Sequence, residues 1–435
     1  MNHVRAFFIG LVAYNGGRMG LLNIFSSHSL TNWAISLDIG TEFIKSMIFE
    51  VKDGKAYIKG VGRSRQKLSD MQGGVVTDIA GVILNCEKSL ELAVEQAKVL
   101  PKQVIIGIAG ELVKGTTTAV HYERTKPKNQ IDLPELKEII TKIQRQAFDR
   151  ARRTLAWETG HAEIDVRLVN AAIVDVKIDG YKVTNPLGFQ GKDVEVGVFN
   201  AFAPIVHLGA LQTIAEELEL DLLSVAPEPY AVARAVSEEQ SVEFSAIFVD
   251  IGGGTTDVAL VRAGGIEGTK MFAMGGRTFT KRLAEELGVP FQKAEELKLE
   301  YSDASLPDAK TKQIAEFLEL DIDVWIEGLR IVLEEFGATD LLPSRILLCG
   351  GSSVLPDIYQ RLSAKEWVKD LPFARKPVVQ FIKAAEVSRV VDDTGGARDA
   401  ADITPMALAN LATDLVGQPA PIEGVLSKVV ETLRS

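Results

Sequence analysis

One pattern occurs twice in this chain, as Ser36-Leu37-Asp38-Ile39-Gly40-Thr41 and as Phe248-Val249-Asp250-Ile251-Gly252-Gly253-Gly254-Thr255-Thr256-Asp257. In each copy an apolar run of strand length ends in aspartate, and an apolar residue, glycine and threonine follow. This composition is typical of a tight turn between two strands. The β-forming runs 43–51 and 258–261 come next, so we expect each turn to connect the strands of a hairpin.

The residue types in these turns are suited to binding a polyphosphate together with a metal ion. Asp38 or Asp250, at the end of a buried strand, can hold hydrated Mg²⁺, which prefers oxygen ligands. Glycines let backbone N–H groups approach an anion, and threonines add hydroxyl donors. The donors expected at the phosphates are Gly40, Thr41, Gly252, Gly253, Gly254, Thr255 and Thr256. One such turn also occurs in ordinary hairpins, whereas two copies indicate a clamp that holds a polyphosphate between two domains.

Lys45 is the one cation near the first turn, on the second strand of the expected hairpin. From there its ammonium group can reach a phosphate, and lysine is a common phosphate binder. The alternative is a surface lysine whose charge stays in water. Beside a phosphate turn, we favour the phosphate role.

Three more segments complete a known set of motifs. They are Pro227-Glu228-Pro229-Tyr230-Ala231-Val232-Ala233, Gly275-Gly276-Arg277-Thr278-Phe279 and Leu347-Leu348-Cys349-Gly350-Gly351-Ser352-Ser353. With the two turns, they resemble the phosphate loops, connecting helices and adenosine loop of the actin-like ATPases, the superfamily of actin, sugar kinases and large heat-shock chaperones. The resemblance implies an α/β fold of two actin-like (ribonuclease H-like) lobes with ATP and Mg²⁺ between them.

The resemblance also implies roles for single residues. Asp38 and Asp250 are expected on the Mg²⁺ side, and Glu228 is expected to orient the attacking water or a magnesium-bound water. Gly275 and Gly276 open the second connecting helix, and the residues expected at the adenosine are Gly350, Gly351 and Ser352. From the residues alone, Glu228 is also explained as an acid in the first turn of a helix, where the helix dipole favours it. A Gly-Gly pair is equally explained as a plain strand-to-helix loop.

A further segment, Ala294-Glu295-Glu296-Leu297-Lys298, lies on an expected helix. Similar segments in bacterial actins place the glutamate on the ribose hydroxyls and the lysine beside the base. Glu295 and Lys298 are three positions apart and share a helix face, so a surface ion pair is the alternative.

The composition is that of a globular protein with room for two or more domains, since 46% of the 435 residues are hydrophobic and 25% are charged. A net charge of −11 disfavours nucleic acid as a partner. Cys86 and Cys349 are too few cysteines for a disulfide framework or a zinc site, and they fit a reducing cytoplasm. No apolar run is long enough for a transmembrane helix.

The motifs divide the chain into a leader, two lobes, an insert and a tail. Residues 114–201 predict a small α+β unit, with a helix from Asp132 to about Leu155 and strands at 167–178 and 193–203. The expected parts are a leader at 1–32 outside the fold, lobe 1 at 33–113 and 202–238, the insert at 114–201, lobe 2 at 239–415 and a tail at 416–435.

The loop from Asp179 to Gly191 is dense in turn residues. Its sequence resembles the corresponding loop in the FtsA family of bacterial division proteins, in which a strand-helix-strand-strand subdomain, 1C, replaces subdomain 1B of actin. The resemblance covers roughly residues 33–415. It implies self-association into filaments, binding to the tail of the tubulin homologue FtsZ, and a cytoplasmic protein held on the inner face of the cell membrane.

Two segments are candidate membrane anchors. In the tail, one helical face collects the apolar residues Val425, Leu426, Val429, Val430 and Leu433. This is the pattern of a short interfacial helix, and a terminal helix packed on the core is the alternative. The apolar leader residues 21–25 are the second candidate.

Two residues depart from the family pattern. Glu42 stands where a small or hydroxyl residue is more common, so its charge must point away from the phosphate or weaken binding. Cys349 replaces a small hydroxyl residue before Gly350. Neither change removes a backbone donor, and both leave the rate of hydrolysis open; we expect at most a slow ATPase.

Three kinds of function compete. The Asn185-to-Gly191 loop favours an FtsA-like protein that polymerises and links FtsZ-type filaments to the membrane. The weak tail helix and the apolar leader favour a PilM-like component of type IV pilus assembly, which binds a short peptide of a membrane partner. A small-molecule kinase needs a base and a substrate pocket beside the γ-phosphate. A chaperone needs a substrate-binding domain after the ATPase, which we do not expect beyond the Gly350-Gly351 loop.

Overall fold

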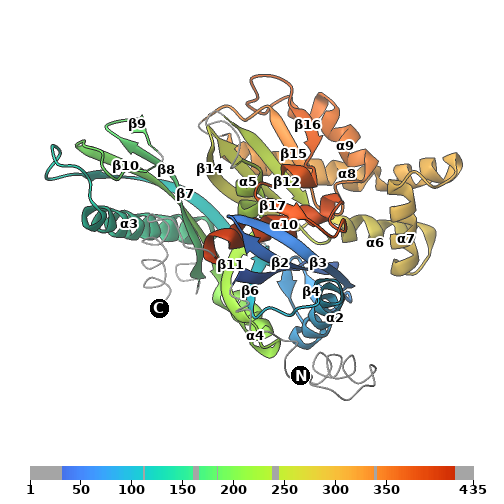
Figure 1. Cartoon of the computed structure of the whole chain (residues 1–435). Helices are drawn as coiled ribbons and strands as arrows, with labels where there is room; N and C mark the ends of the chain where they lie inside the picture. The colour runs from blue at the N-terminus through green and yellow to red at the C-terminus, as the bar shows by residue number, and fades with distance from the viewer. Residues whose placement is uncertain are drawn as a thin grey trace, which may run out of the picture.

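The structure is a computed structural model that describes residues 32–110, 113–159, 166–183, 185–237, 244–337 and 340–416. Apart from Asn32 and Val416, the predicted leader and tail lie outside the described residues, and so do both candidate anchors, at 21–25 and around Val425. Two large sheets form two lobes that lie side by side (Figure 1). Among the described residues, no helix combines the length and apolar character needed to span a bilayer.

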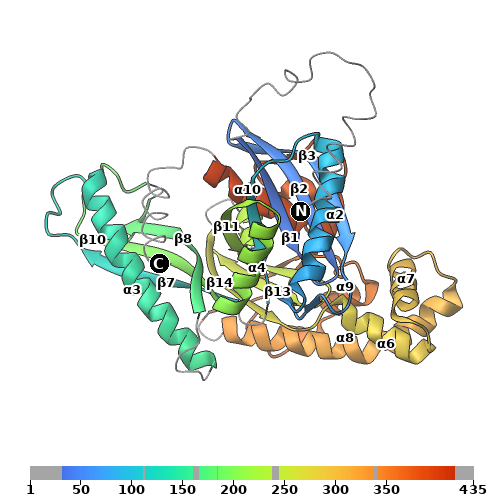
Figure 2. The same cartoon turned by 90° about the horizontal axis from the view of Figure 1, so that it is seen from below.

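Lobe 1 is built on a six-stranded sheet in the order β11-β6-β1-β2-β3-β17. Its strands are β1 (Trp33–Ile39), β2 (Phe43–Lys52), β3 (Lys55–Arg65), β6 (Gln103–Ile108), β11 (Asp221–Pro227) and β17 (Val390–Asp392). Alternate residues of β1 enter different cores, because successive side chains of a strand point to opposite faces. Ile35 packs with α2 (Ile79–Ala97) and α4 (Ile205–Glu217), whereas Ala34 packs with α5 (Glu228–Ser237) and α10 (Ile403–Val416). Figure 2 shows α2 and α4 on the same side of the sheet.

Lobe 2 contributes five strands to a nine-stranded sheet in the order β16-β15-β12-β13-β14-β7-β10-β8-β9. The five are β12 (Ala246–Ile251), β13 (Thr256–Arg262), β14 (Gly265–Phe272), β15 (Arg345–Cys349) and β16 (Val378–Phe381). Its helices are α6 (Gly276–Leu287), α7 (Phe291–Ser302), α8 (Asp308–Phe336) and α9 (Pro356–Ser363). Every residue of β12 is buried, because one face packs on these helices and the other packs in the core shared with α5.

The insert supplies the other four strands of that sheet, together with one helix. It consists of β7 (Lys114–Glu123), α3 (Leu133–Thr159), β8 (Val166–Ile178), β9 (Tyr181–Lys182) and β10 (Asp193–Pro204). The strand-helix-strand-strand order is as predicted, and the carboxylate of Asp132 accepts a hydrogen bond from Glu135 N at 2.8 Å at the helix start. The insert has its own core, and β7 joins β14 through two residue pairs, Thr116 with Gly268 and Gly115 with Thr269, and through a hydrogen bond from the Thr117 hydroxyl to Ile266 O.

The end of the described chain returns to lobe 1. Strand β17 pairs in parallel with β3, and α10 packs against β1, β2 and α5. The sequence motifs predict that lobe 2 extends from 239 to 415, whereas β17 and α10 make these contacts with lobe 1. We therefore propose that the segment from β17 to α10 is part of lobe 1; the apolar run 403–412 of α10 is buried because it lies between the lobe 1 sheet and α5.

Candidate functional site

The two predicted phosphate turns touch each other across the lobes. The β1–β2 turn follows Asp38 and the β12–β13 turn follows Asp250. A Cβ added to Gly254 would lie 2.8 Å from Thr41 Oγ1, and one added to Gly253 would lie 2.8 Å from Glu42 Cβ. Glycine is required at both positions because the opposite turn occupies the space.

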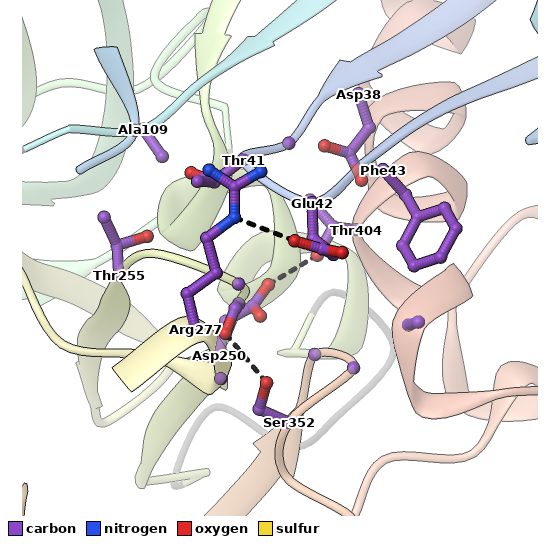
Figure 3. Close-up of a pocket in the computed structure, with 18 of the residues that line it drawn as sticks. Asp38, Thr41, Glu42, Phe43, Ala109, Asp250, Thr255, Arg277, Ser352 and Thr404 are labelled. Atoms are coloured by element: carbon purple, nitrogen blue, oxygen red, sulfur yellow. Dashed lines mark hydrogen bonds and ion pairs between the residues drawn. The ribbon is translucent and has the colours of Figure 1, made fainter. Parts of the chain in front are cut away.

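One pocket receives most of the predicted site residues from both lobes (Figure 3). Those that line it are Asp38, Gly40, Thr41, Lys45, Glu228, Asp250, Gly252, Gly253, Thr255, Gly276, Glu295, Lys298, Gly350, Gly351 and Ser352. Three predicted residues do not line it: Gly254, Thr256 and Gly275. Gly254 is at the contact between the turns, and a Cβ on Gly275 would lie 2.6 Å from Gly252 O, so these two glycines allow close packing around the pocket.

The prediction for Thr256 as a phosphate donor is corrected by its hydrogen bonds. Its hydroxyl donates to Met274 O at 2.7 Å and accepts from Trp325 Nε1 at 2.8 Å. The side chain is fully buried and points into the lobe 2 core. The pattern Thr-Thr could not distinguish the two hydroxyls, but successive strand residues point to opposite faces, and only Thr255 lines the pocket.

Lys45 is held inside the pocket and is not a surface lysine. Its ammonium nitrogen lies 2.8 Å from Asp38 Oδ2, and its side chain is 14% exposed. Burial lowers the pKa of Lys45, but the charges of Asp38 and then Asp250 outweigh burial, so the pKa lies above its ordinary value. Lys45 therefore stays charged, and it compensates the aspartate of the first turn.

Three further acids beside the phosphate turns, Glu228, Asp250 and Asp257, form no ion pair within the part of the chain that the structure describes. Burial, and then the nearby carboxylates Asp38, Asp257 and Asp250, raise the pKa of Glu228 well above its ordinary value. Burial also raises the pKa of Asp250, and burial with the charge of Asp250 raises the pKa of Asp257 to about 7. Four acids around one lysine make a poor site for a polyphosphate anion unless a cation accompanies it.

The donor set fits hydrated Mg²⁺. Within the part of the chain that the structure describes, no group of three or more His, Cys, Asp or Glu side chains is arranged to hold a metal ion. Magnesium does not need such a cage, because it keeps several waters and takes one or two carboxylates together with phosphate oxygens. Asp38 and Asp250, one from each lobe, are the carboxylates that would hold it.

The other end of the pocket carries a buried ion pair. Lys298 Nζ lies 2.7 Å from Glu295 Oε2, and both side chains are less than a tenth exposed. The alternative of a surface ion pair is therefore wrong. Thr280 Oγ1 donates to Glu295 and accepts from Lys298 at 2.9 Å, so the pair has a fixed position. With Leu299 and Leu355 in the same wall, this end combines fixed polar groups with an apolar surface, as a ribose and a base require.

Several residues that line the pocket were not predicted as site residues, and two of them bind carboxylates of the phosphate turns. Thr404 of α10 donates its hydroxyl proton to Asp250 Oδ2, and Arg277 of α6 binds the carboxylate of Glu42 (Figure 3). Arg277 stands inside a quoted motif, so its position next to Gly276 was an available signal. Thr404 stands in an apolar helix without a motif, and only the return of the chain to lobe 1 brings it to the pocket.

Both departures from the family pattern are accommodated. The carboxylate of Glu42 lies 2.8 Å from Arg277 Nε and 2.7 Å from an Arg65 nitrogen, so two cations neutralise it. Burial, followed by the charge of Asp250, raises the pKa of the Cys349 thiol well above its ordinary value. Cys349 is thus a neutral core group behind the Gly350-Gly351 loop.

Comparison with known proteins gives one family and a set of relatives. The sequence model of the family described as "Cell division protein FtsA" matches residues 247–358. The cell division protein FtsA of Pseudomonas aeruginosa is 26% identical over 341 residues, which cover 73% of this chain and 77% of that protein. FtsA of Streptococcus pneumoniae is 22% identical over 424 residues, which cover 92% of this chain and 88% of that protein.

A solved structure shows the same fold. A chain of the PilM-PilN type IV pilus biogenesis complex superposes with a TM-score of 0.60 at 18% sequence identity, covering 88% of this chain and 97% of that chain. At this identity the likeness concerns the fold alone. Together with the sequence matches it confirms the predicted resemblance and the predicted fold class. The chain is similar in sequence to the cell division proteins FtsA and shares its fold with the chain of the PilM-PilN complex.

Proposed function

We propose that this protein binds ATP with Mg²⁺ between its lobes, polymerises, and links FtsZ-type cell-division filaments to the inner face of the cytoplasmic membrane. One observation supports the proposed binding of ATP. Two aspartate-tipped hairpins from different lobes contact each other and line one pocket, whose far end holds the buried pair Glu295 and Lys298. The proposed role in cell division is supported by the sequence relatives, which are named cell division proteins FtsA.

Different residues of the pocket have different proposed roles in binding the nucleotide. Lys45 provides a fixed positive charge, while Thr41, Thr255 and the glycine N–H groups of both turns provide donors to phosphate oxygens. Mg²⁺, when bound, neutralises phosphate charge beside Asp38 and Asp250. The Gly350-Gly351 backbone and Ser352 provide a flat wall for the adenine, with Glu295 at the ribose. The neighbouring Gly276 and Gly275 allow α6 to begin close to this wall.

Glu228 is the residue that we propose to act on the attacking water. It begins α5, and a Cβ on Gly107 would lie 2.8 Å from its Oε1, so the carboxyl group lies against the backbone of β6. Its raised pKa favours the protonated acid until a bound cation or water network changes the local charge. A protonated acid is a poor base, which supports at most slow hydrolysis.

A second candidate is a PilM-like component of type IV pilus assembly. The observation that favours it is the fold shared with the chain of the PilM-PilN complex. In this case the partner is a short peptide of a pilus membrane protein, whereas FtsA-like function requires the tail of an FtsZ-like filament. For both, the net charge of −11 supports a protein or membrane partner over nucleic acid.

Co-sedimentation tests the proposed function. Purified protein is centrifuged with vesicles of anionic lipid, with and without Mg²⁺·ATP and a peptide of the FtsZ tail. We expect ATP to promote pelleting without lipid and the FtsZ peptide to pellet with protein and vesicles. Capture of a pilus membrane-protein peptide instead would support the second candidate, and ATP-dependent phosphorylation of a sugar would overturn both.

Deletion of Gly424 to Ser435 locates the membrane anchor. If the tail is the anchor, the deletion reduces vesicle binding and leaves ATP binding unchanged. Undiminished vesicle binding would move the anchor to the leader, which deletion of residues 1–32 then tests.

A further inference from the structure

Arg277, the second residue of α6, extends from lobe 2 into lobe 1. Its Nε donates to Glu42 Oε2 at 2.8 Å, its Nη1 to Met71 O at 2.9 Å and its Nη2 to Lys67 O at 3.3 Å. All three acceptors belong to lobe 1, while the backbone N–H of Arg277 donates to Gly253 O in the second phosphate turn at 2.7 Å. A single side chain thus ties the two lobes together beside the phosphate turns.

Glu42 is the matching acid on the first turn. Its side chain is 12% exposed and that of Arg277 is 10% exposed, so the ion pair is largely shielded from water. Arg65 of β3 contacts the other carboxylate oxygen at 2.7 Å, but Arg65 is 38% exposed and comes from the same lobe as Glu42. Of these two cations on Glu42, Arg277 is the one that comes from the other lobe.

The carbonyls that Arg277 binds lie on a braced segment, residues 66–78, which we call the strap. The buried Asp70 accepts hydrogen bonds from Lys67 N at 2.8 Å and from Asn85 Nδ2 at 2.9 Å, which fixes the strap to α2. Gly74, near the tip of the strap, lines the pocket. A movement of Arg277 away from lobe 1 would leave the strap carbonyls and the Glu42 carboxylate without this donor.

We propose that Glu42 and Arg277 are positioning residues that set the distance between the two phosphate hairpins and keep the pocket closed around its nucleotide. This rests on the proposed function. Opening the lobes breaks an ion pair with little exposure to water and two further hydrogen bonds, so Arg277 loses its carboxylate and both carbonyl acceptors, while Glu42 keeps only Arg65. Nucleotide release therefore requires this contact to open, and its loss speeds release without removing a ligand of the phosphates.

The test is a double-mutant cycle with Glu42→Gln, Arg277→Gln and the double variant. The dissociation rate of a fluorescent ATP analogue with Mg²⁺ is measured by stopped flow. We expect each single change to raise the rate about tenfold, within the coupling range of contacting residues, and the double variant to be no faster than either single one. Additive effects, or unchanged rates, would overturn the proposal. Arg65→Gln is the matched control, because it removes the same-lobe contact of the same carboxylate, and we expect a rate within about twofold of the native protein.

A second readout does not need nucleotide. Hydrogen exchange at the strap amides of Thr77 and Asp78 is followed in the free native protein and in each variant, with circular dichroism to verify the fold. We expect faster exchange in the Arg277→Gln and Glu42→Gln proteins and native exchange in Arg65→Gln. If native protein binds no nucleotide, the proposed function fails, while the exchange data still decide the contact. If Arg277→Gln weakens ATP binding and Glu42→Gln strengthens it, Arg277 is a phosphate ligand and the positioning role is wrong.

Discussion

The two phosphate hairpins have the same register but carry opposite charges at one matched position. In the first hairpin Asp38 lies opposite Lys45, and in the second Asp250 lies opposite Asp257. Like charges that face each other across an antiparallel pair are destabilising, and opposite charges are stabilising. The aspartate of the first hairpin is therefore compensated by the lysine opposite it. The two facing aspartates of the second hairpin are compensated either by a proton or by a cation that binds together with the ligand.

This difference divides the roles between the lobes. Lobe 1 holds a permanent positive charge at the phosphates, and lobe 2 holds acids whose pKa values are raised mainly by burial. A polyphosphate that enters alone meets repulsion from lobe 2, whereas a magnesium-polyphosphate complex meets complementary charge from both lobes. If the pocket binds a nucleotide as proposed, we therefore expect it to select the metal complex.

The largest effect is expected from Asp250→Ala in the second hairpin. It removes a carboxylate on the Mg²⁺ side without creating a large core cavity, so we expect the fold to persist and nucleotide affinity to fall at least about 100-fold. Calorimetric titration with Mg²⁺·ATP measures the loss. Thr404→Val is the control, since it removes only the hydrogen bond to Asp250, and its affinity should fall much less. If the Asp250→Ala protein binds Mg²⁺·ATP with native affinity, Asp250 is not part of the binding site.

A smaller effect on affinity and a clear effect on stability are expected from Lys45→Met in the first hairpin. The change leaves Asp38 buried and unpaired, because that carboxylate is only 4% exposed, and loss of one partner of a buried ion pair costs about 3–5 kcal/mol. Urea unfolding measures the cost. The double variant Asp38→Asn with Lys45→Met should recover most of the stability but not the phosphate affinity, which separates the two roles of the lysine.

The next prediction uses the pKa of Asp257, which burial and then the charge of Asp250 raise from 3.8 to about 7. An acid with a raised pKa keeps its proton in the folded state after the unfolded state has lost it. Asp257 therefore destabilises the nucleotide-free protein progressively as pH rises from about 4 to about 7. Urea unfolding at pH 5 and pH 8 should show a smaller loss of stability in Asp257→Asn than in native protein. Asp303→Asn, at an exposed site, should behave as native; equal slopes for all three proteins would contradict this origin of the pH dependence.

The smallest effect on binding is expected from Glu228→Gln. Because the acid already favours its protonated form, glutamine preserves its shape and charge, and ATP affinity should change by less than about threefold. Phosphate release should fall, since Glu228 can lose its proton beside a bound cation and then accept one from water, whereas an amide cannot. Steady-state phosphate assays and calorimetry measure the two quantities; a native hydrolysis rate would show that Glu228 does not act on the water.

The local sequence pattern was sufficient to predict the two hairpins. It could not show which residues from distant segments of the chain contact them. Asp-x-Gly-Thr after an apolar run specifies a strand and a turn through short-range sterics, so Asp38 and Asp250 were identified. The burial of Glu295 and Lys298 depends on α6 and the Gly350-Gly351 loop, and a three-residue spacing contains no information about either.

Contacts between the two lobes were still harder to predict from the local sequence pattern. Thr404 reaches Asp250 over 154 positions, and Arg277 reaches Glu42 over 235. Contacts of this kind follow from the packing of whole elements, which hydrophobic periodicity does not encode. The proposed place of β17 to α10 in lobe 1 could not be predicted for the same reason, because β17 is a three-residue strand whose pairing with β3 has no local signal.

The narrow seam between β7 and β14 has a mechanical consequence. Both ends of the insert are covalently continuous with lobe 1, through β6 and α4, while two residue pairs and the side chains of Thr117 and Lys182 connect the insert to lobe 2. At this seam Gly115 has no room for a side chain, because a Cβ would lie 2.3 Å from Phe199 Cζ. A rotation of one lobe against the other must therefore either break these contacts or move the insert together with lobe 2 and bend the chain where the insert joins lobe 1.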